Sequence, residues 1–169
     1  MRLFFFLSFF ILNNSLAEVG KVLKVTGNTG AYLIRESSKI TLTPELLLKL
    51  GDEIFTQNSI PVIHLYPGTQ LSLAFNSQIK LTEHMIEENA ETVKKSTSVI
   101  ELIRGILRAS ITREEGEEVD QKIQAKGVSF GVRGTEFEVS QEGDDEVDLD
   151  VFEGSVEVSS PMFIHLCRK

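Results

Sequence analysis

The sequence predicts an all-β domain whose short strands form a sandwich, a barrel or a coil. Apolar and polar residues alternate at period two, as in Leu71, Ser72 and Leu73, and turn residues recur roughly every eight positions. Two segments, VIELIRGILRAS around Gly105 and DLDVFEGSVEVS around Gly154, align as a strand, a glycine-containing corner and a second strand. We therefore expect a fold assembled from repeated strand and corner units.

Residues 1–17 have the features of a secretory signal peptide. Arg2 supplies a positive charge, an apolar run follows, and small residues precede a predicted cleavage site after Ala17. The apolar run at 3–12 is shorter than the roughly 20 residues of a bilayer span, which disfavours an uncleaved anchor. We expect a periplasmic or secreted protein with one domain at 18–160 and a C-terminal tail at 161–169.

The net charge limits the expected classes of partner, and the single cysteine shows what must hold the domain together. The formal net charge is −8, and it becomes −9 when Arg2 is removed with the leader. Such a chain repels nucleic acid and anionic lipid, which leaves a protein, a glycan or a cation as the expected class of partner. The single cysteine, Cys167, has no pairing residue, so the core must hold the domain. We interpret Cys167 as an ordinary tail residue, with an intermolecular disulfide as the alternative.

The N-terminal part of the domain predicts a hairpin and then one short helical turn. Residues 22–25 and 32–34 flank a cluster of turn residues, which is typical of a hairpin. Residues 44–50 predict a helical turn, because Thr43 can cap it and Pro44 suits its first position. Its leucines are too dense for a solvent-facing helix, so we expect them to fill part of the core.

Strands are expected again from residue 54 onward. Leu71, Leu73 and Phe75 share one face at period two. The predicted strands lie at residues 54–55, 62–65, 71–75 and 79–81.

Two polar stretches interrupt this pattern. Residues 82–98, TEHMIEENAETVKKSTS, carry few large apolar side chains, and we expect an exposed excursion that includes one irregular helix at most. Residues 113–121, REEGEEVDQ, combine five carboxylates with a glycine and predict a solvated loop.

An acidic row is the best candidate for bound metal. If 144–151 is a strand, its acidic side chains project from one face while Val147, Leu149 and Val151 pack inward. The weak calcium candidates are Asp144, Glu146, Asp148 and Asp150. A calcium shell wraps one ion, whereas alternate residues of a strand are about 6.5 Å apart, so a solvated face is favoured. The row can also discourage pairing of an exposed sheet edge.

No motif predicts catalysis or a cofactor. His64, His84 and His165 are isolated, without the spacing of a zinc site. The nucleophile patterns G-x-S-x-G and S-x-x-K do not occur. We therefore expect no enzyme and no cofactor.

The segment GVRGTEFEV, residues 131–139, predicts a structural corner. Gly131 and Gly134 can take backbone angles closed to other residues, after which Phe137 and Val139 alternate into the core. Arg133, between the two glycines, can tie the corner to carbonyls or to a carboxylate, with ligand binding as the alternative. The pattern also fits an RNA-clamping G-x-x-G loop, but that loop requires helices and a basic surface.

The motifs resemble those of the FecR domain family. The resemblance covers roughly residues 19–159: VGKVLKVTG, LGDEIFTQNSIPVIHLYPGTQLSL, ELIRGILRAS, GVRGTEFEV and VFEGSVEV. It implies an all-β domain with strands coiled in a solenoid-like or barrel-like way and a role in binding or signal relay, with Gly131, Arg133, Gly134, Thr135, Phe137 and Gly154 as motif residues. Membrane regulators of the family add a cytoplasmic segment that binds a sigma factor and one membrane span. Here the domain directly follows the predicted leader, so sigma-factor regulation is not carried over.

We therefore expect a non-catalytic binding module with a protein partner in the cell envelope. In this hypothesis an exposed edge strand adds to the partner's sheet. A glycan-binding or peptidoglycan-associated structural protein is the alternative.

Overall fold

The computed structural model describes residues 17–27, 30–88, 94–112, 117–132, 134–141, 143, 146–160 and 163–168. Side chains are described in these ranges except at 86–88, 94, 95, 117–119 and 163–168. The described residues form strands and no helix, which confirms the all-β prediction. The strands are β1 (Glu18–Gly27), β2 (Tyr32–Arg35), β3 (Ser38–Thr41), β4 (Leu47–Lys49), β5 (Glu53–Phe55), β6 (Ser59–Leu65), β7 (Thr69–Leu73), β8 (Gln78–Glu88), β9 (Lys94–Ile111), β10 (Glu117–Ala125), β11 (Val128–Val132), β12 (Glu136–Gln141), β13 (Asp148–Glu153), β14 (Ser155–Ser160) and β15 (Phe163–Arg168).

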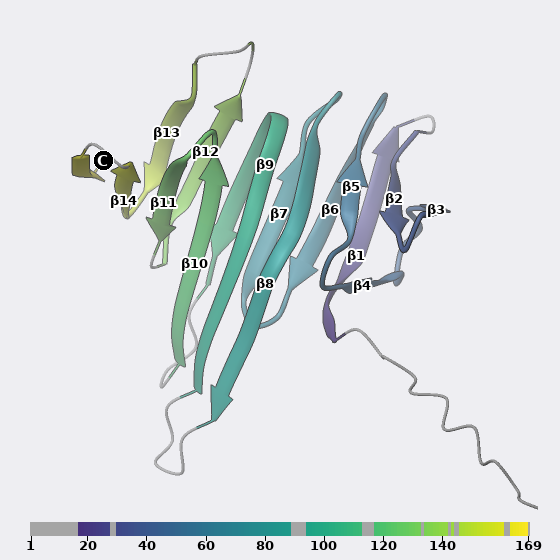
Figure 1. Cartoon of the computed structure of the whole chain (residues 1–169), viewed down its shortest axis with the longest axis horizontal. Coiled ribbons are helices and arrows are strands. Elements are labelled where there is room, and N and C mark those ends of the chain that lie inside the picture. Colours follow the sequence, from purple (N-terminus) through teal and green to yellow (C-terminus); the bar gives the residue numbers. More distant parts are fainter. Residues whose placement is uncertain are drawn as a thin grey trace, which may run out of the picture.

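The strands form two layers that β9 joins into one curled sheet (Figure 1). We call the layers sheet A and sheet B. The order in sheet A is β4-β1-β6-β7-β9-β12-β13. The order in sheet B is β3-β2-β5-β8-β9-β10-β11-β14-β15. The first half of β9 pairs in sheet B and its second half in sheet A, so the two layers share one core.

The core explains why these short strands are stable. Alternate residues point inward, as in β12, where Phe137 and Val139 are fully buried between partly exposed neighbours. Each fully buried leucine, isoleucine or phenylalanine contributes about 1.5–3 kcal/mol by leaving water. The largest buried side chains are Phe130, Phe137, Leu33, Leu48, Ile54, Ile63, Leu65, Leu71, Leu73, Ile79, Ile100 and Leu102.

The corner repeat predicted around two glycines is confirmed. Gly105 and Gly154 have φ values of +89° and +85°, a region in which glycine is favoured. At Gly105 the chain passes from sheet B to sheet A within β9. At Gly154 it passes from sheet A, through β13, to sheet B, through β14.

The helical turn predicted at 44–50 is wrong. These residues form a turn followed by the edge strand β4. Glu45 has a φ of +66°, which a right-handed helix does not allow. Leu47 is 40% exposed whereas Leu48 is fully buried, an alternation of period two. The closely spaced leucines therefore lie alternately on the inner and outer faces of a turn and a strand that close one end of the core.

The hairpin predicted between 22–25 and 32–34 is also wrong. β1 pairs with β4 and β6, whereas β2 pairs with β3 and β5. The turn residues between them carry the chain from sheet A to sheet B, so a local turn signal marked a change of layer.

The described parts of the two polar stretches are strand, contrary to prediction. Residues 82–88 extend β8 and residues 94–98 begin β9, these two strands pair, and residues 89–93 lie outside the described residues. Ser96 and Ser98 are buried although they are small and polar, so the inward face has no hydrophobic signal there. Residues 117–121 begin β10 rather than continuing a loop, and residues 113–116 lie outside the described residues.

Two strand ends also differ from prediction. β7 ends at Leu73, and Phe75 is 53% exposed in the following turn rather than facing the core. β13 begins at Asp148 and not at 144.

Candidate functional site

The GVRGTEFEV corner packs against the corner at Gly154. Gly134 has a φ of +65°, and a Cβ at Gly154 would lie 2.9 Å from its carbonyl oxygen and 2.5 Å from Thr135 Cγ2. The Thr135 carbonyl accepts the Ile111 N–H at 3.0 Å, which ties the corner to β9. Only Gly134 has the special angle expected of both motif glycines, since Gly131 lies within β11 without it. The described part of the motif therefore serves the packing of two sheet crossings.

Arg133 was predicted either to tie the corner to neighbouring groups or to bind a ligand. This residue lies outside the described residues. Its predicted role stays a prediction.

A second corner lies at the opposite ends of the strands, around Ser77. Its Oγ accepts the Ile106 N–H at 3.0 Å, and a Cβ at Gly105 would lie 2.6 Å from the Ser77 Cα. Thr56 Oγ1 accepts the Ser77 N–H at 2.8 Å and donates to the Ala74 carbonyl at 2.6 Å. The threonine that follows Gly-Asp in LGDEIFT thus satisfies the backbone where the chain passes from β7 to β8.

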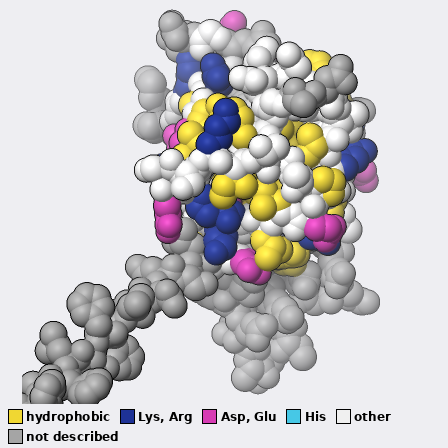
Figure 2. Space-filling view, turned by 90° about the vertical axis from the view of Figure 1, so that its right-hand side faces the viewer, with side chains coloured by type: hydrophobic (Ala, Val, Ile, Leu, Met, Phe, Trp, Pro, Cys, Tyr) yellow, Lys and Arg dark blue, Asp and Glu magenta, His cyan; other side chains and the backbone are white. Residues whose placement is uncertain are grey.

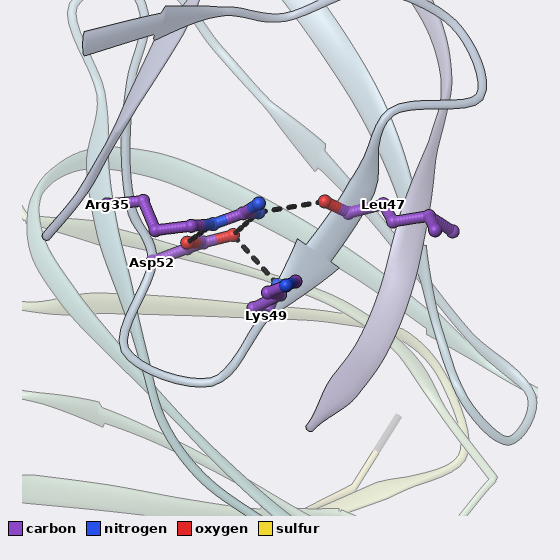
Figure 3. A network of polar contacts seen from close by, with 4 residues as sticks. All are labelled: Arg35, Leu47, Lys49 and Asp52. Atoms are coloured by element: carbon purple, nitrogen blue, oxygen red, sulfur yellow. Dashed lines mark hydrogen bonds and ion pairs between the residues drawn. The ribbon is translucent and has the colours of Figure 1, made fainter. Parts of the chain in front are cut away.

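The aspartate of the same motif forms a buried ion pair with Arg35 (Figure 3). The Asp52 side chain is fully buried, and the Arg35 side chain is 18% exposed. Arg35 donates Nε to Asp52 Oδ1 at 2.7 Å and Nη2 to Oδ2 at 2.6 Å. These hydrogen bonds to Asp52 raise the pKa of Arg35 against the opposing effect of burial. The pair is bidentate, the strongest geometry for a guanidinium and a carboxylate.

This pair also occupies the free edge of β4. Arg35 Nη2 donates to the Leu47 carbonyl at 2.8 Å, and the Lys49 N–H donates to Asp52 Oδ2 at 2.8 Å. Leu47 and Lys49 alternate with residues whose backbone groups bond towards β1, as the bond from Val22 N–H to the Leu46 carbonyl shows. Two of the groups that would bond a further strand at β4, the Leu47 carbonyl and the Lys49 N–H, are therefore already bonded by side chains. Arg35 was not among the predicted site residues. The available signal was that Arg35 lies two positions after Leu33 in YLIR and so shares its inward face.

The other sheet edges differ in character. β3, the outer strand of sheet B, carries no strand on its far side in the part of the chain that the structure describes. β13, the outer strand of sheet A, pairs with β12 alone and presents exposed Asp148 and Asp150. The opposite outer strand of sheet B is β15, whose side chains lie outside the described residues.

The predicted acidic row lies on β13 and the turn before it. Glu146, Asp148 and Asp150 are exposed, whereas Val147, Leu149 and Val151 pack against the core. Asp144 lies outside the described residues. Within the described side chains, no three His, Cys, Asp or Glu groups are placed to hold one metal ion.

The aromatic side chains on the outer face of sheet B stack on each other. The rings of Tyr32 and Phe55 are stacked at 4.9 Å, and Lys39 Nζ lies 3.8 Å from the Tyr32 centroid. Because β2 lies between β3 and β5, Tyr32 has a neighbour on each face of its ring. This ladder stabilises the sheet but does not offer the face of Tyr32 to a sugar.

The described histidines are separate from one another. His84 Nδ1 is 2.8 Å from Ser98 Oγ, and burial lowers the pKa of His84. His64 packs edge-on against Tyr66, and burial, with a smaller effect of Lys21, lowers its pKa. Both imidazoles are thus held towards the neutral form. The side chains of His165 and Cys167 lie outside the described set.

The comparisons with known proteins give a family and a fold. The sequence model of the family "FecR protein" matches residues 52–157. Two crystal structures of a "putative anti-sigma factor" from Parabacteroides distasonis ATCC 8503 are similar, with TM-scores of 0.53 and 0.52 at 20% identity. Each similarity covers 69% of this chain and 50% of the other, so the match spans half the length of those structures. No curated protein matches the chain.

Among the residues that the structure describes, none form a helix with the length and hydropathy needed to cross a membrane.

Proposed function

Because the chain belongs to the FecR protein family, we propose that it is a non-catalytic module that relays a signal by binding another protein in the cell envelope. The match of the family model to residues 52–157 is the observation that carries this proposal. The similar structures, each described as a "putative anti-sigma factor", support a place in signalling.

The placement of the motif residues favours binding over catalysis. Thr56, Gly105, Thr135 and Gly154 meet other backbone segments at the sheet crossings, and Asp52 is fully buried in its ion pair. These contacts make the motif residues part of the scaffold. A partner would then be recognised by the exposed edges and faces that the scaffold holds in place.

Photo-crosslinking in intact cells tests this proposal. A photoreactive residue at Phe75 or Met85, which are 53% and 59% exposed, should capture a discrete envelope protein that mass spectrometry identifies. A probe at exposed Glu157 on β14 serves as the control for contacts made by any surface position. Recovery of the same adducts from every position, or of cell-wall fragments alone, would contradict a specific protein partner.

We also propose that the chain is exported to the periplasm or beyond and is cleaved after Ala17. The apolar run at 3–12 and the small residues Ser15 and Ala17 support this proposal. N-terminal sequencing of the protein from a periplasmic extract should begin at Glu18. A protein that keeps Met1 would refute the cleavage.

A further inference from the structure

The two ends of the molecule differ in charge. Residues 18–50, which form β1 to β4, contain five basic and three acidic residues, and Asp52 neutralises one of the basic residues, Arg35, at this end. Residues 134–160, which include β12 to β14, contain ten acidic residues and no basic one. β1 to β4 lie at one end of the long axis, and β13 and β14 lie at the other (Figure 1). Figure 2 looks onto the first end, where Lys and Arg side chains lie among hydrophobic ones.

Among the described residues, each end also has an outer strand with a ladder partner on one side alone. At the basic end, Arg35 and Asp52 occupy the edge of β4, which leaves β3 as the edge that can accept a strand. At the acidic end, β12 is the one described strand that pairs with β13, and although β13 touches β15, no ladder joins these two strands in the described part of the chain.

The side chains of β3 and β13 match each other in one antiparallel register. Lys39 points outward over Tyr32, while Ile40 packs against the core. On β13, Asp150 is exposed, while Leu149 packs against the core. With Lys39 opposite Asp150, Ile40 lies opposite Leu149, so charges of opposite sign meet outside and apolar groups meet inside.

Pairing of β13 with a second β13 would place carboxylates against carboxylates. Pairing of two β3 strands brings no charge attraction.

We propose that β3 of one molecule pairs with β13 of a second copy, so that molecules join head to tail. The joint connects sheet B of one copy with sheet A of the next and leaves one free edge at each end. Such a contact is heterologous, and it builds open chains of copies instead of a closed dimer. β3 has only four residues, so the interface is small and the association is weak and reversible.

Sedimentation velocity of the purified mature chain tests the proposal. Over about 0.01–1 mM protein, the range in which a small interface becomes populated, the wild type should form dimers and longer species. The Lys39→Glu variant or the Asp150→Lys variant should associate about 5- to 30-fold more weakly, because each places like charges opposite each other. The double variant Lys39→Glu/Asp150→Lys should recover the wild-type affinity.

A matched control distinguishes this contact from general charge effects. Lys24→Glu makes the same charge change at an exposed position of β1, away from both edges, and should leave the association unchanged. Circular dichroism of each variant should show the wild-type strand content. A wild type that stays monomeric over the whole range would overturn the proposal. A closed dimer whose affinity is unchanged by Asp150→Lys would also overturn it, as would a double variant that does not associate.

Discussion

Replacement of Asp52 by asparagine tests whether the buried ion pair holds the basic end together. The Asp52 side chain is fully buried and accepts three hydrogen bonds, two from Arg35 and one from the Lys49 N–H. Loss of one partner from a buried pair costs about 3–5 kcal/mol, since the remaining charge stays uncompensated. Arg35 keeps 18% exposure and can regain some hydration, so we expect a loss of about 2–4 kcal/mol.

Urea unfolding measures this loss against a surface pair. Glu136→Gln removes the carboxylate that Arg108 contacts at 2.7 Å, where both side chains are substantially exposed, and should cost about 0.2–1 kcal/mol. The slope of the unfolding free energy against urea should stay the same in both variants. Equal losses for Asp52→Asn and Glu136→Gln would refute the reasoning, because burial would then have no influence on the strength of the pair.

Three further predictions concern a corner, the pH dependence and metal. Gly154→Ala adds a Cβ 2.5 Å from Thr135 Cγ2, at a residue with a φ of +85°. The control, Gly127→Ala, adds a Cβ at a φ of +77° where no other atom lies within 4 Å. Thermal unfolding should show that Gly154→Ala is less stable than Gly127→Ala by at least about 1 kcal/mol. Burial lowers the pKa of His84 below its ordinary value of about 6.5, so the unfolded chain binds protons more readily. The free energy of unfolding should therefore fall as the pH drops below about 6.5. In urea titrations between pH 7 and 5, this free energy should fall less in the His84→Gln variant than in the wild type. An equal fall in both proteins would exclude a contribution of His84. A chelator should leave the melting temperature unchanged, since the described carboxylates do not converge, and a drop of several degrees would instead indicate bound calcium.

Period-two alternation predicted the fold class because it reports directly on a sheet with one buried face. Leu71, Leu73, Phe137 and Val139 alternate in sequence and are fully buried. The corner at Gly105 and Gly154 was also readable, since a glycine between two alternating segments marks a strand that must bend.

Pairing partners could not be read in this way. The turn residues after β1 gave the same signal for a hairpin as for a crossing between layers, and only the distant strands β4 to β6 decide between them. The turn at 44–50 failed for a related reason. Thr43 and Pro44 fit a helix start locally, whereas Glu45, with its φ of +66°, follows the path that closes the end of the core.

The ion pair of Arg35 and Asp52 shows why the candidate site lay beyond sequence reasoning. Arg35 ends β2, and Asp52 directly precedes β5, 17 positions later. Neither residue stands out among the other charged residues of the sequence. Their meeting follows from the pairing of β2 with β5, because the register that sets Ile34 opposite Glu53 brings Arg35 opposite Asp52.

The LGDEIFT segment links the end of the domain to its interior. Asp52 closes the β4 edge through Arg35, and four residues later Thr56 satisfies the backbone of the corner at Ser77. Such a short segment can serve both junctions because β5, which lies between them, spans only three residues. The motif therefore determines which edge of the basic end stays available, because it blocks β4 and leaves β3 open. In the proposed head-to-tail contact, the blocked edge of β4 would direct pairing to β3, and we expect a change at Asp52 to alter that contact although Asp52 itself is buried.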